Sequence, residues 1–86
     1  MLSTEIDHCK HILVEIADEA VEARLCVEAE LPGNALDAVV QLVRAGDRLQ
    51  GALVMRWREA GATWAMIGES LGTTGSAARQ RYGSAL

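Results

Sequence analysis

The spacing of apolar residues predicts a first long helix at the N-terminus. Ser3 or Thr4 is positioned to cap it, and Glu5 and Asp7 fall in the first turn, where the helix dipole favours acids. The apolar positions then recur at alternating intervals of three and four, which is the period of one helix face; they are Ile6, Cys9, Leu13, Ile16, Ala20, Ala23 and Val27. We expect this helix to end at Leu31, before Pro32-Gly33-Asn34.

A second long helix is predicted from Ala35 almost to Gly61, with Asn34 as its cap. Its apolar residues form two groups, Leu42, Leu49, Leu53 and Trp57 on one side and Leu36, Val40, Val43 and Val54 on another. A helix that is apolar on two sides is expected to lie between two neighbours. Gly46 and Gly51 leave a break near residues 45–47 as an alternative, but the spacing stays in phase across both glycines and favours one continuous helix.

Two short helices complete the predicted fold. Thr63 is positioned to cap a helix from Trp64 to Leu71, Gly72-Thr73-Thr74 forms a turn, and a last helix runs from Gly75 to about Tyr82. Half of the 86 residues are hydrophobic, and the apolar set is mainly Ala, Leu and Val without Phe, which suits closely packed helices. We therefore predict an all-α fold in which a long N-terminal helix packs on a long central helix, followed by a helix-turn-helix. The predicted parts are residues 1–33 and 34–86.

The C-terminal segment has the features of a DNA-reading helix-turn-helix. Such a motif needs a short scaffold helix, a tight turn and a second helix whose outward face enters the major groove. Ile67 and Leu71 are expected to face the core, and Gly68 allows the two helices to approach closely. The same spacing of apolar residues would suit any helical hairpin, so the motif by itself leaves both interpretations open.

The segment IGESLGTTGSAARQRYG resembles the helix-turn-helix of sigma-factor region 4, and residues 36–82 are similar to small bacterial DNA-binding proteins related to it. The segments that match best are Arg58–Trp64, Ile67-Gly68, Leu71-Gly72 and Gln80–Gly83. The resemblance implies that Thr74, Ser76, Arg79 and Gln80 face DNA bases and that Thr63 and Arg81 lie near the backbone. Gly75 occupies a position of the reading surface where family members often have Arg or another long polar residue, so a possible base contact is missing here.

The side chains suit these roles. Arg79 can donate a bidentate pair to guanine and Gln80 can pair with adenine, each worth about 1–3 kcal/mol of discrimination between bases. Arg56 and Arg58, at the end of the preceding helix, are expected to contact phosphates, and Thr63 begins a helix whose free N–H groups can do the same.

The two halves of the chain differ in charge. Residues 1–43 hold nine acids and two bases, a net charge of −7, whereas residues 44–86 hold three acids and six arginines, a net charge of +3. Both sets could simply solvate helix surfaces. A core this small leaves a modest stability margin, which favours a second subunit. We predict a homodimer joined through Ile6, Cys9, Leu13, Ile16 and Ala20, with two reading helices about 34 Å apart on a near-palindromic site.

An alternative function is a protein-interaction module. In that hypothesis the acidic N-terminal helix docks on a basic partner, and the helix-turn-helix contacts RNA polymerase, another regulator or a toxin.

Other classes have little support in the sequence. His8, Cys9, His11 and Glu15 lie close along one helix, but no second ligand pair accompanies them, so no metal or other cofactor is predicted. No nucleophile elbow or phosphate-binding loop indicates an enzyme. The chain has no long apolar run and no secretory signal pattern, which leads us to expect a cytoplasmic protein, located at the nucleoid if it binds DNA, with Cys9 and Cys26 reduced.

Overall fold

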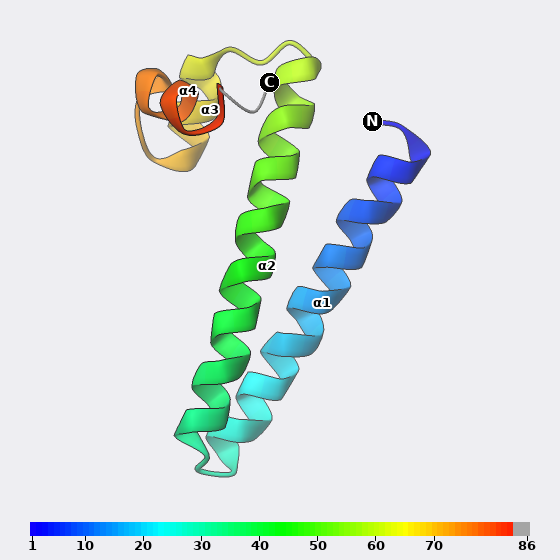
Figure 1. The fold of residues 1–86 in the computed structure, drawn as a ribbon, viewed down its shortest axis with the longest axis vertical. Coiled ribbons are helices and arrows are strands. Elements are labelled where there is room, and N and C mark those ends of the chain that lie inside the picture. The colour runs from blue at the N-terminus through cyan, green and yellow to red at the C-terminus, as the bar shows by residue number, and fades with distance from the viewer. Residues whose placement is uncertain (84–86) are drawn as a thin grey trace. The chain divides into compact units, whose positions relative to one another are not determined.

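The computed structural model describes residues 1–83, and all regular structure in that range is helical (Figure 1). The four helices are α1 (Ser3–Glu28), α2 (Pro32–Glu59), α3 (Trp64–Leu71) and α4 (Gly75–Tyr82). The predicted all-α class is confirmed, as is the order of two long helices followed by two short ones. Within the described part of the chain, no helix is both long and apolar enough to cross a membrane.

The chain forms two compact units, Met1–Gln50 and a second one from Gly51 onward. The helix α2 contributes to both, because it continues through Gly46 and Gly51 as predicted. The predicted division after residue 33 falls in the first turn of α2, inside the first unit.

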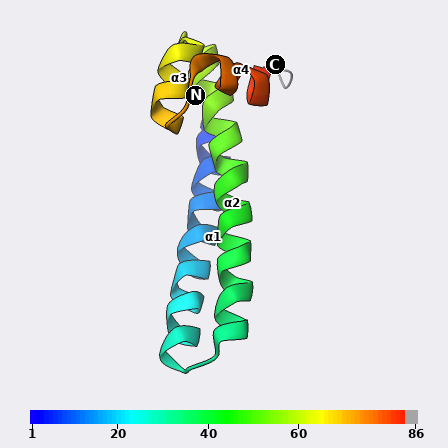
Figure 2. The same cartoon turned by 90° about the vertical axis from the view of Figure 1, so that its left-hand side faces the viewer.

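The first unit is an antiparallel hairpin of α1 and the first part of α2, which lie side by side in both ribbon views (Figures 1 and 2). Cys9 and Ile12 of α1 pack against Ala45 and Leu49 of α2, and Ile16 packs against this cluster. An ion pair between Glu15 and Arg48, 2.5 Å apart, joins the helices along one flank. The predicted packing of the two long helices is therefore confirmed.

The row of α1 that faces α2 differs from the predicted one. The buried and half-buried positions are Glu5, Cys9, Ile12, Glu15, Ile16, Glu19, Ala23 and Cys26. The predicted row shares Cys9, Ile16 and Ala23 with this set, but Leu13 and Val27 are 51% and 65% exposed. Neighbouring rows such as those of Ile12 and Leu13 lie only about 100° apart, so spacing alone does not choose between them. The small residues that α2 offers, Ala35, Ala38 and Ala45, allow close contact along the Ile12 row.

The ends of both long helices differ from the prediction by one to three residues. The helix α1 stops at Glu28, where the N–H of Leu31 donates to the carbonyl of Cys26 and Glu30 adopts a left-handed φ of +58°. Pro32 then begins α2 instead of stopping α1, because its fixed φ suits the first helical position. At the N-terminus neither Ser3 nor Thr4 caps α1; the Leu2 N–H donates to the Glu5 carboxylate instead.

The second unit encloses a small core between the end of α2, α3 and α4. Its buried members are Val54, Ala62, Ile67 and Ala78, and Trp64, Leu71 and Tyr82 pack against them. The N–H of Ala62 donates to the carbonyl of Trp57 at 3.0 Å, and Gly61, with φ +104°, supplies the left-handed residue that closes α2. The short helices α3 and α4 are thus fixed on the end of α2.

Candidate nucleic-acid interface

Both short helices begin at the caps that the sequence predicts. The hydroxyl of Thr63 accepts a hydrogen bond from the N–H of Met66, and that of Thr74 accepts one from Ala77, each at 3.1 Å. Between the helices, Gly72 adopts a φ of +74°, and Thr73 donates to the carbonyl of Gly68 at 2.8 Å. These bonds satisfy backbone groups at both sides of the turn and fix where α4 begins.

Two glycines bring α3 and α4 into backbone contact. A Cβ atom added at Gly68 would lie 2.5 Å from the carbonyl carbon and oxygen of Thr74, and one added at Gly75 would lie 2.9 Å from the backbone nitrogen of Ala65. Neither position has room for a side chain. The predicted closeness at Gly68 is therefore present, and Gly75 takes part in the same contact.

This packing gives Gly75 a role that the sequence analysis missed. The residue was predicted to lie on the base-reading surface, and its glycine was interpreted as a lost contact. In the structure Gly75 is half-buried against the start of α3, so only its backbone can take part in such a surface. The glycines on both sides of the Gly72 turn, Gly68 and Gly75, were the sequence feature that could have indicated this close helix contact.

The outward face of α4 carries three of the predicted base-contact residues. Ala78 is 1% exposed and Tyr82 packs on the core, so both define the inward side. Ser76, Arg79 and Gln80 are exposed and, at about 100° per residue, fall within one sector of the helix. Thr74, exposed at the cap, stands at the start of this helix. The structure thus brings Ser76, Arg79 and Gln80 together on one exposed face of α4.

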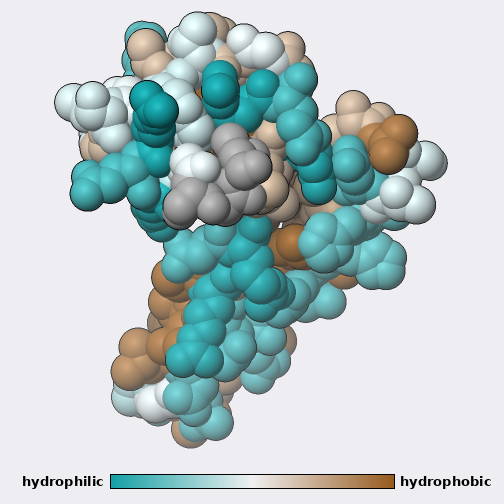
Figure 3. All heavy atoms as spheres, turned by 45° about the horizontal axis from the view of Figure 1, so that its top comes forward, coloured by the Kyte–Doolittle hydropathy of each residue, from teal (hydrophilic) through white to brown (hydrophobic). Residues whose placement is uncertain are grey.

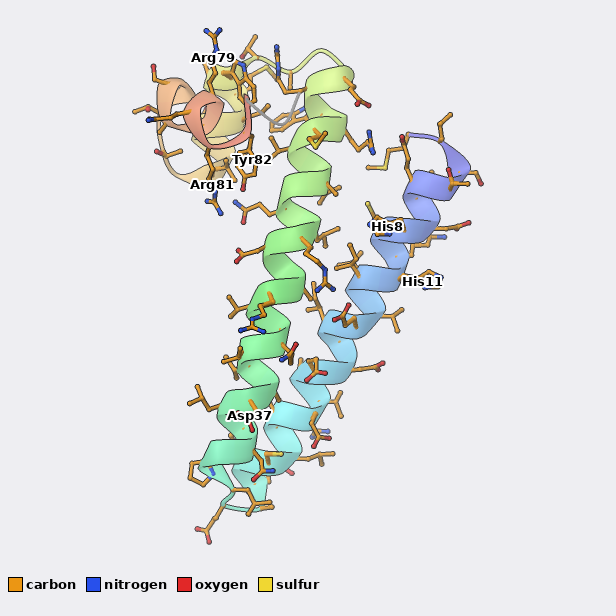
Figure 4. All side chains as sticks on the ribbon, in the orientation of Figure 1. His8, His11, Asp37, Arg79, Arg81 and Tyr82 are labelled. Carbon is orange, nitrogen blue, oxygen red and sulfur yellow. The ribbon has the colours of Figure 1, made fainter. Side chains whose placement is uncertain are left out.

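The two arginines of α4 point in opposite directions. Figure 4 shows the side chains of Arg79 and Arg81 on opposite sides of the helix. The Arg81 guanidinium lies 5.0 Å from the centre of the Tyr82 ring. Within residues 1–83 neither arginine forms an ion pair with an acid. Arg79 therefore belongs to the outward face with Ser76 and Gln80, whereas Arg81 lies at another edge.

Arg56 and Arg58, the predicted phosphate contacts on α2, both interact within the chain. Arg58 donates to the carbonyl of Ala62 at 2.8 Å and stacks 4.9 Å from the centre of the Trp64 ring, while its Nε is buried and has no hydrogen-bond partner among residues 1–83. Arg56 donates to both carboxylate oxygens of Glu59 at 3.1 Å. Arg58 therefore connects the end of α2 to α3, and phosphate binding by Arg56 would compete with its ion pair.

The aromatic residues divide between core and surface. Trp64 and Tyr82 pack against the core, and the Tyr82 hydroxyl is buried without a hydrogen-bond partner among the described residues. Trp57, which belongs to an apolar row of the predicted second helix, is 38% exposed. Trp57 lies one helical turn after Leu53, so the apolar spacing of α2 gave no sign that this row of the helix is partly exposed.

The residues predicted to join two copies lie partly inside the hairpin. Cys9 is buried against α2 and Ile16 packs on the same cluster, whereas Ile6, Leu13 and Ala20 are exposed. His8 and His11 are exposed on α1 (Figure 4). Among residues 1–83 no three His, Cys, Asp or Glu side chains are arranged to hold a metal ion.

Cys9 and Cys26 are both free thiols. Burial raises the pKa of the Cys26 thiol, and the hydrogen bond that it donates to the Glu22 carboxylate raises it further, as does the charge of that carboxylate. Burial and the Glu22 carboxylate therefore both favour the neutral thiol of Cys26.

Comparisons with protein-family models, with curated proteins and with solved structures found no match for this chain.

Proposed function

We propose that this protein binds double-stranded DNA by placing the outward face of α4 in the major groove, as a transcriptional regulator or nucleoid-associated protein. The observation that carries the proposal is the contact between α3 and α4 at Gly68 and Gly75, which leaves Ser76, Arg79 and Gln80 exposed on one face of a capped helix. A scaffold helix packed tightly on a reading helix is the arrangement that a helix-turn-helix requires.

The chemistry of the exposed residues supports direct reading of bases. Arg79 offers a planar fork that matches the O6 and N7 acceptors of guanine, and Gln80 offers a donor and an acceptor for adenine. Ser76 is short and can pair with several bases. Because only two long side chains extend from this face, we expect modest sequence preference from one copy.

Groups around the outward face of α4 are suited to bind phosphates and so to position the protein on DNA. Arg81 and the N–H groups at the start of α3, beside Thr63, lie outside the reading sector and are suited to phosphate oxygens. Arg58 supports the interface indirectly, because its hydrogen bond to Ala62 and its stacking on Trp64 fix α3 on the end of α2. We assign Arg56 a minor share, because Glu59 already neutralises its charge.

Binding to DNA is tested by fluorescence anisotropy on labelled duplexes across a range of salt concentrations, after selection of a preferred site from random DNA. Arg79→Ala should weaken binding to the selected site by about tenfold and flatten the preference for it. Arg81→Ala should weaken binding to all duplexes alike and lower the salt slope by about 1.

The matched control is Arg44→Ala, which removes an exposed arginine of the hairpin. It should leave both affinity and preference nearly unchanged. Absence of binding at low salt, or equal losses for Arg44→Ala and Arg79→Ala, would overturn the proposal. If the protein does not bind DNA at low salt, the better hypothesis is that the acidic surface of α1 binds a basic protein.

A further inference from the structure

The hairpin leaves large apolar side chains uncovered along one flank. We call this surface the apolar face and define it by Ile6, Leu13 and Val27 of α1 and Leu36, Val39 and Val43 of α2. Each of these residues is between 40% and 65% exposed. By contrast, the residues buried between α1 and α2 are mostly small: of Cys9, Ile12, Cys26, Ala35, Ala38, Ala45 and Leu49, only two are large.

The two rows belong to the same side of the hairpin. The ion pair between Glu15 and Arg48 marks one flank. With about 100° per residue, Leu13 lies on the other side of the buried row from Glu15, and Val43 lies on the other side of its buried row from Arg48. Both apolar rows therefore lie on the flank opposite the ion pair. Figure 3 shows hydrophilic residues over the hairpin surface that it displays and hydrophobic ones along an edge.

Charge is distributed so that two such faces can meet. The same helical spacing places the α1 acids Asp7, Asp18 and Glu22 either on the flank of the ion pair or on the side of α1 away from α2. The apolar flank carries Lys10 and Arg24 together with Glu28 and Asp47, so its charges balance, and Arg24 already pairs with Glu28. A net charge of −7 in residues 1–43 would oppose contact through the other flank.

Gly46 gives a second, independent indication. It lies in the interior of α2, and a Cβ atom added there would meet nothing within 4 Å. Glycine weakens a helix, and no contact with the residues that the structure describes requires it at this position. Helical spacing places Gly46 beside Val39 and Val43 on the apolar flank, where a helix from outside could approach the backbone closely.

We infer that the apolar face binds the same face of a second copy, forming a four-helix bundle from two hairpins. The face is about 31 Å long on α1, from Ile6 to Val27, and about 10 Å long on α2, from Leu36 to Val43. With each helix about 10 Å wide, its footprint is roughly 400 Å². This is about half of the ~800 Å² of accessible surface that each partner buries in a standard interface, which corresponds to a weak dimer. The inference deepens the proposed function, because two copies would carry two α4 helices.

The decisive variant is Gly46→Ala, examined by sedimentation velocity and thermal unfolding without DNA. The unaltered chain should sediment at twice its 9.2 kDa mass. In an uncovered helix this change would raise the folding equilibrium constant by about two- to fivefold. At the inferred interface the added methyl group meets the partner helix, so we expect the dimer dissociation constant to rise by at least about tenfold.

Gly51→Ala is the matched control, because Gly51 also lies in the interior of α2 and a Cβ atom there would make only an ordinary 3.8 Å contact with Tyr82, outside the apolar face. It should leave the dimer intact. A second pair introduces charge: Val43→Glu should give a helical monomer, whereas Val14→Glu, at an equally exposed valine outside the face, should stay dimeric. Circular dichroism confirms that each variant remains helical.

A monomeric unaltered chain would overturn the inference, as would a dimer that survives both Gly46→Ala and Val43→Glu or one that Val14→Glu also dissociates. Because mass is measured without DNA, failure here would leave DNA binding by single copies standing. A dimer that binds no DNA would refute only the proposed function.

Discussion

The two units of the chain differ in how well they bury their large apolar residues. In the second unit, Ile67 is 1% exposed, and Val54, Leu71 and Tyr82 close around it. In the hairpin, alanines and cysteines make up most of the contact, while Leu36 and Val43 remain more than half exposed. Burial of apolar surface is the main favourable term in folding. The second unit therefore has a closed core of its own, whereas the hairpin depends more on whatever covers its apolar face.

Glycine is used differently in the two units. Gly68 and Gly75 lie in backbone contacts that exclude any side chain, whereas Gly33 and Gly46 face open space within the chain. The helix ends differ in the same way. Gly61 and Gly72 supply left-handed residues after α2 and α3, but Glu30 supplies that conformation after α1. The hairpin thus tolerates local strain that the second unit avoids.

The largest effect should come from a substitution that opens the contact between α3 and α4. Gly68→Ala forces a methyl group against the backbone of Thr74, and we expect a loss of about 3 kcal/mol in the free energy of unfolding of the second unit. Urea unfolding followed by tryptophan emission checks this, because Trp57 and Trp64 both lie in that unit.

Gly51→Ala provides the control within the same unit. Its Cβ atom would lie an ordinary 3.8 Å from Tyr82, so a gain of about 0.4–1 kcal/mol is expected. Equal effects of the two substitutions would show that the close backbone contact at Gly68 does not control the stability of the second unit.

A smaller and opposite effect is expected at the turn of the hairpin. Glu30→Gly removes the steric cost of a left-handed φ and should stabilise the chain by about 1 kcal/mol, measured by thermal unfolding at a fixed protein concentration. Glu30→Ala removes the same charge but keeps the strain, so it should give no such gain. If the alanine variant is stabilised as much as the glycine variant, charge and not backbone strain is responsible.

The smallest effect concerns the thiol of Cys26. In a Cys9→Ala background, alkylation of Cys26 by iodoacetamide should reach its half-maximal rate at a higher pH than it does in the urea-unfolded chain, because burial and Glu22 both raise the pKa of the thiol. Glu22→Gln removes the charge and its hydrogen bond to the thiol, so it should move this midpoint to lower pH. Identical pH profiles for the folded and unfolded chains would mean that the end of the hairpin does not shield Cys26.

The sequence alone was sufficient for much of the architecture. Apolar spacing determined the two long helices and the continuity of α2, because helical periodicity is a local property. Thr63, Gly72 and Thr74 determined the ends of the short helices, since caps and left-handed turns depend on a few neighbouring residues. Ser76, Arg79 and Gln80 could be placed on one face for the same reason.

Only the tertiary structure decided which surfaces meet. It chose the row of Ile12 over that of Leu13, because the alanines of α2 allow close contact there and adjacent helical rows are nearly equivalent in sequence. It assigned Gly75 to the contact with α3 and Arg58 to Trp64 and Ala62, interactions between segments whose approach no local pattern encodes. The exposed flank of the hairpin became visible for the same reason, since an apolar residue is left uncovered only by the arrangement of its neighbours.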